Sequence, residues 1–302
     1  MHVSVLLDES IKYLNLNDKS IIVDCTLGYG GHSSAVLKNI SNGHLYSFDQ
    51  DKDAIRYSSK RLSDISDNFT IINSNFVNLK KELNKLNVNE VDGILYDLGV
   101  SSPQLDEGDR GFSFHKDALL DMRMNQGQEL TAYKVVNEYS YEDLVRVLRV
   151  YGEEKYATSI VKGIINNRPI KTTLELVEVI KNNVPEKYRR DKHPARKTFQ
   201  AIRIEVNDEL NVFEDSLNQA LDLIKIGGRV CVITFHSLED KICKEVFKRV
   251  SSIDSNLKNL PVIPKHLMPK YKVVKVIEPS IDELDSNNRA RSAKLRVIER
   301  IG

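Results

Sequence analysis

The chain has 302 residues, of which 41% are hydrophobic and 29% are charged, and its formal net charge at pH 7 is +1. This composition is ordinary for a soluble globular protein of one large or two moderate domains, and it excludes a protein that binds polyanions through overall charge. No apolar stretch has membrane-spanning length, and the N-terminus lacks the charge order of a signal peptide. The three cysteines lack metal-ligand spacing and suit a reducing compartment. We therefore expect a cytoplasmic protein with neither a membrane segment nor a metal site.

Three short apolar runs in the first third of the chain each end in an aspartate. These aspartates are Asp24, Asp49 and Asp97. Runs this brief, β-branched or aromatic and bounded by turn formers, predict buried strands of a parallel sheet with helices between them. Ligands of such sheets bind at the carboxyl ends of the strands. The aspartates are therefore expected to gather where a nucleotide-like ligand binds.

A glycine-rich loop follows the first run. It contains Gly28, Gly30 and Gly31, and His32 and Ser33 then lead into a predicted helix. Glycines let the backbone approach a ligand closely, and the start of the helix offers unpaired N–H groups. The same pattern also serves as a plain tight connection between a strand and a helix.

The first two aspartates narrow the choice of ligand. Asp49 stands where a carboxylate accepts both ribose hydroxyls, which NAD and S-adenosylmethionine share. Asp24, at the end of the first strand, would repel a pyrophosphate and favours a ligand with a cationic amino-acid portion, such as S-adenosylmethionine. The alternative for Asp24 is a side chain that hydrogen-bonds its own loop.

The third aspartate opens a small, polar turn that runs from Asp97 through Pro103 to Gln104. Amino-group methyltransferases place an acidic or amide residue here, followed by a turn that contains proline. The lone pair of a cytosine or adenine amine is delocalised into the ring, and an acceptor for its N–H hydrogen bonds helps to localise that pair. Asp97 suits this role and equally suits anchoring the cofactor. Zinc deaminases act on the same amine, but the H-x-E and P-C-x-x-C segments that they need are absent.

Further segments complete a pattern that spans nearly the whole chain. Together with the loop and the Asp97 turn, they resemble the bacterial 16S rRNA cytosine-N4 methyltransferase family. Two positions depart from the family pattern, because Ser4 stands where relatives more often carry proline and Cys25 where they more often carry glycine. The segments are His2–Leu7, Arg110–Phe114, Leu120–Met124, His193–Ile204 and Asn288–Arg296.

The resemblance implies an α/β fold of the class I S-adenosylmethionine-dependent methyltransferase type, with a Rossmann-like seven-stranded sheet and an inserted all-helical domain. It implies methyl transfer from S-adenosylmethionine to the exocyclic N4 of a cytidine in the decoding region of 16S rRNA, within the small ribosomal subunit. Asp97 is the candidate catalytic residue, and Phe76 either packs on the adenine or is an ordinary core aromatic. The cofactor contacts carried over by the resemblance are Gly30, Gly31, His32, Asp49, Phe76, Asp97 and Gln104.

The predicted domains are residues 1–105 with 211–302, which bind the cofactor, and residues 106–210, which form one wall of the RNA cleft. Apolar spacing predicts helices over 132–137, 141–151, 153–165, 174–182 and 198–210 in the insertion. Later strands are predicted over 229–235, 272–277 and 294–300. A helix over 238–250 is expected to begin after Ser237 as its N-cap. The preceding His236 suggests a catalytic triad, but methyl transfer needs no covalent enzyme intermediate, which favours a structural role.

Basic residues concentrate in two runs, 187–197 and 289–300. Each either contacts RNA phosphates or is a solvated surface. Phe112 or Phe114 either stacks on an extruded cytosine or packs in the core.

Two other classes of protein share part of this pattern. A nicotinamide-dependent oxidoreductase shares the glycine loop and Asp49, but leaves Asp24 and the Asp97 turn unexplained. A non-catalytic ribosome-binding protein shares the basic runs and predicts no methyl transfer.

Overall fold

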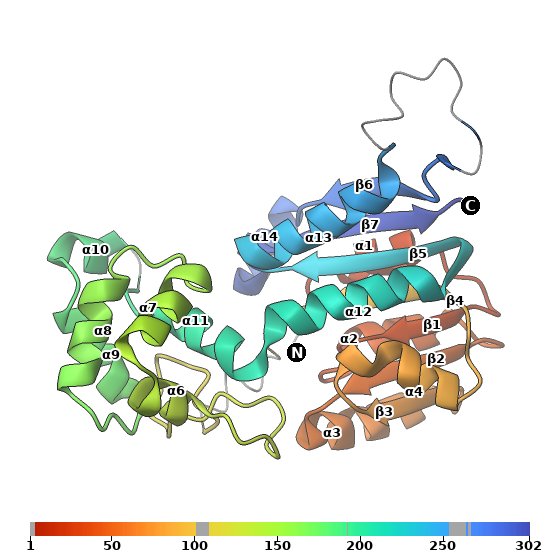
Figure 1. Ribbon diagram of the computed structural model, residues 1–302. Coiled ribbons are helices and arrows are strands. Elements are labelled where there is room, and N and C mark those ends of the chain that lie inside the picture. The colour runs from red at the N-terminus through yellow and green to blue at the C-terminus, as the bar shows by residue number, and fades with distance from the viewer. Residues whose placement is uncertain (1–3, 101–108, 192, 254–263, 265–266) are drawn as a thin grey trace. The chain divides into compact units, whose positions relative to one another are not determined.

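The computed structural model describes residues 4–100, 109–191, 193–253, 264 and 267–302, and these form two compact units (Figure 1). One unit comprises Met1–Gly99 with Leu210–Gly302, and the other comprises Val100–Glu209. Among the described residues, no helix combines the length and the apolar character that crossing a membrane requires.

The first unit is built on a seven-stranded sheet, as the resemblance implies. The strand order is β3-β2-β1-β4-β5-β7-β6, and β7 runs antiparallel to both β5 and β6 while the other pairs are parallel. The strands are β1 (Ile21–Asp24), β2 (His44–Asp49), β3 (Phe69–Asn73), β4 (Val91–Asp97), β5 (Ile224–Thr234), β6 (Tyr271–Ile277) and β7 (Lys294–Arg300).

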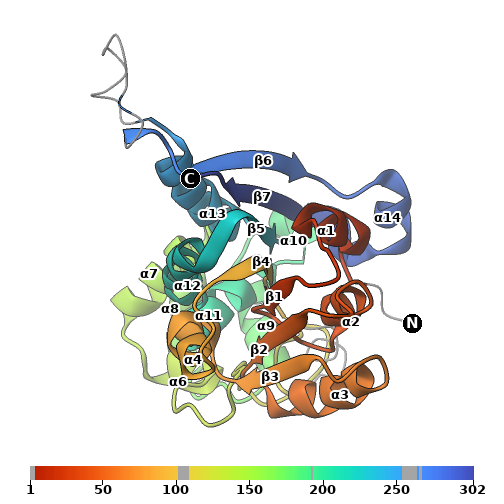
Figure 2. The same ribbon diagram turned by 90° about the vertical axis from the view of Figure 1, so that its right-hand side faces the viewer.

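Helices cover both faces of this sheet (Figures 1 and 2). One face carries α4 (Leu79–Lys85), α12 (Glu209–Leu223) and α13 (Ser237–Ser251), whose apolar sides share a core with the strands. The opposite face carries α1 (Leu7–Leu14), α2 (Gly31–Leu37), α3 (Lys52–Ser63), α14 (Ile281–Ser286) and the 3-10 turn η4 (Asn288–Ser292). The central strands β1 and β4 are largely buried, which is why their sequences are mostly continuous apolar runs, whereas the edge strand β6 is largely exposed.

The second unit is helical and has its own apolar core. Two predicted helices differ from the observed ones by more than one residue at an end. The helix predicted from residue 153 begins at Ala157, because the buried Glu154 side chain accepts hydrogen bonds from the Tyr156 N–H (3.0 Å) and the Tyr188 hydroxyl (2.9 Å). The helix predicted to reach residue 210 ends at Asn207, because Asp208 adopts a left-handed conformation with φ +50°. The helices are α6 (Ala132–Glu138), α7 (Tyr141–Val150), α8 (Ala157–Asn166), α9 (Thr173–Asn182), α10 (Glu186–Asp191) and α11 (Arg196–Asn207).

The basic run 289–300 is largely engaged within the first unit. Arg296 on β7 donates two hydrogen bonds to the Asp240 carboxylate on α13, at 2.7 and 3.0 Å. Arg300 donates to the Ile224 carbonyl at 2.7 Å, and Lys294 lies 3.5 Å from Glu278. Contacts within the unit therefore engage Lys294, Arg296 and Arg300, so this part of the run is not simply a solvated surface.

The pair between Asp240 and Arg296 should stabilise the first unit in a pH-dependent way. The hydrogen bonds from Arg296 lower the pKa of Asp240 below its ordinary value of 3.8. The stabilisation is therefore present above that pH and is lost as the pH falls below it. Asp240→Asn should lower the free energy of unfolding at pH 7 by about 1–2 kcal/mol, and the difference from wild type should shrink below about pH 4.

Denaturant unfolding at pH 7 and pH 3.5 measures this effect. Asp222→Asn is the matched control, because Asp222 pairs with Lys80 in a largely exposed position and should contribute little. Equal losses in the two variants at pH 7 would contradict the prediction.

Candidate active site

The three aspartates come together at the carboxyl edge of the sheet. Strand β1 lies between β2 and β4 and is parallel to both, so Asp24, Asp49 and Asp97 end three adjacent strands. The glycine loop, residues 26–33, leaves β1 at the same edge and contacts all three carboxylates. The clustering expected from the sequence is confirmed.

Asp24 holds the loop and does not face outward. Its carboxylate accepts hydrogen bonds from the Thr26 N–H (3.0 Å) and the Ser33 hydroxyl (2.7 Å), and the residue is 1% exposed. Ser33 in turn lies 3.0 Å from the Ser47 hydroxyl. Burial raises the pKa of Asp24 more strongly than these hydrogen bonds lower it. Of the two interpretations of Asp24, the structure shows the hydrogen bonds to its own loop, and its preference for a cationic ligand stays a prediction.

Asp49 is joined to the loop and to the start of α3. Its Oδ2 accepts from the Gly28 N–H and its Oδ1 from the Asp51 N–H, both at 2.8 Å. An ionised carboxylate has about four acceptor positions, so these two bonds leave others for a ligand. Burial raises the pKa of Asp49 to about 6, and the hydrogen bonds from Asp51 and Gly28 offset part of that rise.

The glycines of the loop occupy positions that a side chain would disturb. Gly30 has φ +74°, a left-handed conformation that glycine adopts without strain. A Cβ atom on Gly31 would lie 1.9 Å from the Ser4 Oγ. Ser4 therefore packs against the loop in the position where relatives more often carry proline.

Asp97 is held at its backbone and at one carboxylate oxygen. Its N–H donates to the Thr26 Oγ1 at 2.7 Å, and its Oδ2 lies 3.3 Å from the His32 Nδ1. Its Oδ1 is buried and has no hydrogen-bond partner among the described residues. His32 itself is 4% exposed. An acceptor atom thus lies at the end of β4 without a hydrogen bond to any residue that the structure describes.

Phe76 and Gln104 are the two predicted cofactor contacts that remain, and the structure describes only Phe76. Phe76 begins the 3-10 turn η1 (Phe76–Asn78), is half-buried and packs edge-on against Tyr96 with ring centroids 5.8 Å apart. That arrangement leaves part of the ring accessible. Gln104 lies outside the described residues.

Two residues of the site were missed by the sequence prediction. Ser58 on α3 donates its hydroxyl hydrogen bond to the Gly28 carbonyl at 2.7 Å, and Thr26 bridges Asp24 and Asp97. Thr26 borders the loop, so its position was a usable signal. No signal in the sequence pairs Ser58 with the loop, because this contact depends on how α3 packs.

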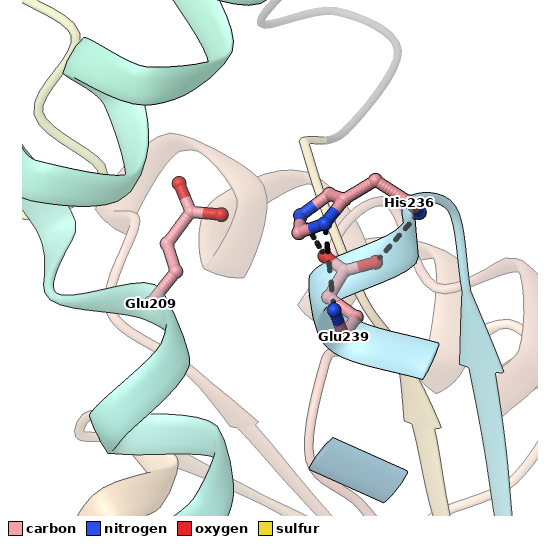
Figure 3. A group of neighbouring side chains, drawn as sticks. All are labelled: Glu209, His236 and Glu239. Carbon is pink, nitrogen blue, oxygen red and sulfur yellow. Dashed lines mark hydrogen bonds and ion pairs between the residues drawn. The ribbon is translucent and has the colours of Figure 1, made fainter. Parts of the chain in front are cut away.

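The segment after β5 is structural (Figure 3). His236, not Ser237, is the N-cap of α13, and its Nδ1 faces the Glu239 N–H at 3.4 Å. The buried Glu239 carboxylate accepts in return from the N–H groups of Phe235 (2.7 Å) and His236 (3.2 Å). This is a capping box, so the structural role expected for His236 is confirmed.

Glu209, also labelled in Figure 3, belongs to the second unit. Its two carboxylate oxygens each accept a hydrogen bond from the Arg203 guanidinium at 2.8 Å.

An aromatic group lies in the second unit. Phe114 stacks on the His193 ring with centroids 4.5 Å apart, and His115 contacts both rings. Phe112 is 5% exposed and belongs to the core of the unit, with the Arg110 guanidinium 5.9 Å from its ring centroid. Of the two phenylalanines, only Phe114 therefore retains surface that a ligand can touch.

Comparison with known proteins identifies the family of this protein over nearly the whole chain. A model of the MraW methylase family matches residues 1–301. The chain is 55% identical over 306 residues to Ribosomal RNA small subunit methyltransferase H of Exiguobacterium sibiricum, with 99% of this chain and 98% of that protein covered. It is 52% identical over 308 residues to the protein of the same name from Limosilactobacillus fermentum, with the same coverage. A solved rRNA methylase from Streptococcus thermophilus aligns over 100% of both chains, with 13% identity and a TM-score of 0.46, a likeness too weak to support an argument. The family model and the two relatives each cover nearly the whole chain, and they establish that this chain belongs to the MraW methylase family.

Proposed function

We propose that this protein transfers a methyl group from S-adenosylmethionine to the exocyclic N4 of a cytidine in the decoding region of 16S rRNA. Membership of a methylase family and the names of two relatives more than 50% identical support methylation of small-subunit rRNA. The observation that carries the choice of an amine is the fixed, unused Asp97 Oδ1. The partner is the small ribosomal subunit, and its location makes this a cytoplasmic enzyme.

The residues at the carboxyl edge of the sheet suit the cofactor. When bound, S-adenosylmethionine supplies a methyl group on a positively charged sulfur. Asp49 has acceptor positions left for ribose hydroxyls, and Asp24, enclosed beneath the loop, holds the loop in place. The residues that we assign to the cofactor are Gly30, Gly31, His32, Asp49, Phe76 and Gln104, whereas Asp97, which the resemblance also gives as a cofactor contact, is assigned to the target amine.

Asp97 is the proposed acceptor for the target amine. Its Oδ1 accepts an N–H hydrogen bond and so helps to localise the nitrogen lone pair. Because no covalent enzyme intermediate is needed, positioning supplies most of the acceleration, on the order of 7–11 kcal/mol for reacting atoms held at about 3–3.5 Å. An aspartate held at its backbone N–H and at its other carboxylate oxygen is well suited to such positioning.

The second unit supplies the proposed RNA-binding surface. Lys187 and Arg189 on α10 and Arg196 at the start of α11 are exposed. His193, between these helices, stacks on Phe114. Cations beside half-exposed rings suit a single-stranded RNA segment, whose phosphates and bases they contact respectively.

The alternatives that the sequence left open are not supported. A nicotinamide-dependent oxidoreductase is inconsistent with membership of a methylase family. A ribosome-binding protein without activity leaves the free acceptor of Asp97 unexplained.

The direct test is methyl incorporation by the purified protein. We expect labelled methyl groups from S-adenosylmethionine to appear on cytidine N4 in small subunits that lack this modification. Asp97→Asn should lower the single-turnover rate about 10- to 100-fold, as expected for one hydrogen bond to a charged group, with cofactor affinity changed less than about threefold. No incorporation by the wild-type protein would refute the function. An affinity loss in Asp97→Asn equal to the rate loss would make Asp97 a cofactor anchor instead.

Cofactor affinity should depend on pH through Asp49. Because its pKa is raised to about 6, the carboxyl is ionised at pH 7 and becomes protonated as the pH falls toward 5. We expect affinity to fall by up to about tenfold per pH unit below that pKa, and Asp49→Asn to bind weakly without this dependence. Calorimetric titrations between pH 5 and 7 measure it, with Asp53→Asn on α3 as the matched control.

Acid unfolding does not explain such a loss. A raised pKa in the folded state makes the contribution of Asp49 to stability larger below pH 6 and smaller above it. Identical pH profiles for wild type and Asp49→Asn would contradict the assignment of Asp49 to the cofactor.

If the basic residues of the second unit bind RNA, removing their charges should weaken RNA binding, whereas removing charges from the first unit should not. Removing three charges in Lys187→Gln/Arg189→Gln/Arg196→Gln should weaken binding of a decoding-region RNA fragment and reduce the slope of log affinity against log salt by up to about 2. Cofactor affinity should be unchanged. The matched control removes three exposed lysines of α4 in the first unit, as Lys80→Gln/Lys81→Gln/Lys85→Gln. Equal RNA affinity in both triple variants, measured by fluorescence anisotropy, would overturn this placement.

A further inference from the structure

His32 makes a contact that its place in the glycine loop does not require. Its ring is buried at 4% exposure, and its Nδ1 lies 3.3 Å from the Asp97 Oδ2. With so little exposed surface, the imidazole has little area to offer a ligand. The cofactor contact assigned to His32 therefore falls on its backbone, and the ring is left with another role.

The surroundings of the ring favour its charged form. Burial lowers the pKa of His32, but the hydrogen bond to Asp97 and the charges of Asp97 and Asp24 outweigh it, so the pKa is raised above its ordinary value of 6.5. The backbone of Val5 adds a smaller contribution in the same direction. An imidazolium between two carboxylates is consistent with the rule that buried charges are paired.

A lone carboxylate at a strand end can rotate about its χ2 angle, which exchanges its two oxygens. The Asp97 N–H bond to Thr26 fixes the backbone but leaves that rotation free. The His32 contact at Oδ2 is the second constraint, and Oδ1 stays without a partner among the described residues. The two constraints together single out one oxygen as the available acceptor.

We propose that His32 is a positioning residue for methyl transfer, whose Nδ1–H holds the Asp97 Oδ2 and thereby keeps Oδ1 available for the amine of the target base. This inference rests on the proposed function of Asp97 as the amine acceptor. The contact between the two side chains can be tested separately from that function.

The first experiment uses the protein without cofactor or RNA. NMR of protein labelled with ¹⁵N at its histidines follows the titration of all seven imidazoles. The His32 resonance, assigned from His32→Asn, should titrate above 6.5 in the wild-type protein and at a lower pH in Asp97→Asn. The other histidines should be unchanged. A His32 titration that is identical in wild type and Asp97→Asn would overturn the proposed contact.

The second experiment measures single-turnover rate and cofactor affinity in a set of variants. His32→Ala should lower the rate about 10- to 100-fold while cofactor affinity changes less than about threefold. His32→Asn, whose side-chain amide can donate from near the Nδ1 position, should recover most of the rate. His32→Ala/Asp97→Asn should be no slower than Asp97→Asn, because the two residues act as one unit.

Rate losses in the two single variants that multiply in the double variant would overturn the proposal, as would a His32→Ala variant whose defect lies entirely in cofactor affinity. His44→Ala is the matched control, since His44 lies on β2 and faces the Thr70 hydroxyl at 2.9 Å. If His32→Ala does not fold, the rate of His32→Asn and the NMR titration still test the proposed role of His32. A wild-type protein without methyl transfer refutes the proposed function, whereas an active protein with a multiplicative double variant refutes only the role of His32.

Discussion

The glycine loop is held by contacts with three carboxylates, and the geometry of the rest of the site depends on these contacts. Asp24 binds the Thr26 N–H, Asp49 binds the Gly28 N–H, and Asp97 contacts His32. The carboxylates meet because their strands are adjacent and parallel, with β1 in the centre. The sheet thus determines both the path of the loop and the position of every acidic group around it, before any ligand is present.

The three carboxylates lie at the same sheet edge but differ in how many hydrogen-bond acceptor positions the described residues leave unoccupied. Asp24 is fully enclosed, and its hydrogen bonds go to the glycine loop. Asp49 keeps acceptor positions beyond its two backbone bonds, and Asp97 keeps one whole oxygen. The same residue type at one sheet edge thus differs in the acceptor positions left to it, and on these differences our proposed roles for the three aspartates rest.

The sequence predicted the sheet well, because buried parallel strands are continuous apolar runs that end in visible turn formers. It predicted less at the ends of helices, which side-chain contacts and local backbone conformation determine. Glu154 and Asp208 interrupt helices whose apolar spacing continues through them. The sequence left the role of Asp24 open because a carboxylate in that position suits a ligand and its own loop equally, and its hydrogen bond to Ser33, which lies against Ser47, depends on packing. The assignments of the cofactor contacts stay predictions.

The central claim is that the glycine loop and the three carboxylates that contact it form a site for a cationic methyl donor and not for a dinucleotide. Calorimetric titration of the purified protein with S-adenosylmethionine, and separately with NADH, tests this most directly. We predict saturable one-to-one binding of S-adenosylmethionine and no binding of NADH at the same concentrations. Absence of S-adenosylmethionine binding, or comparable binding of NADH, would contradict the account.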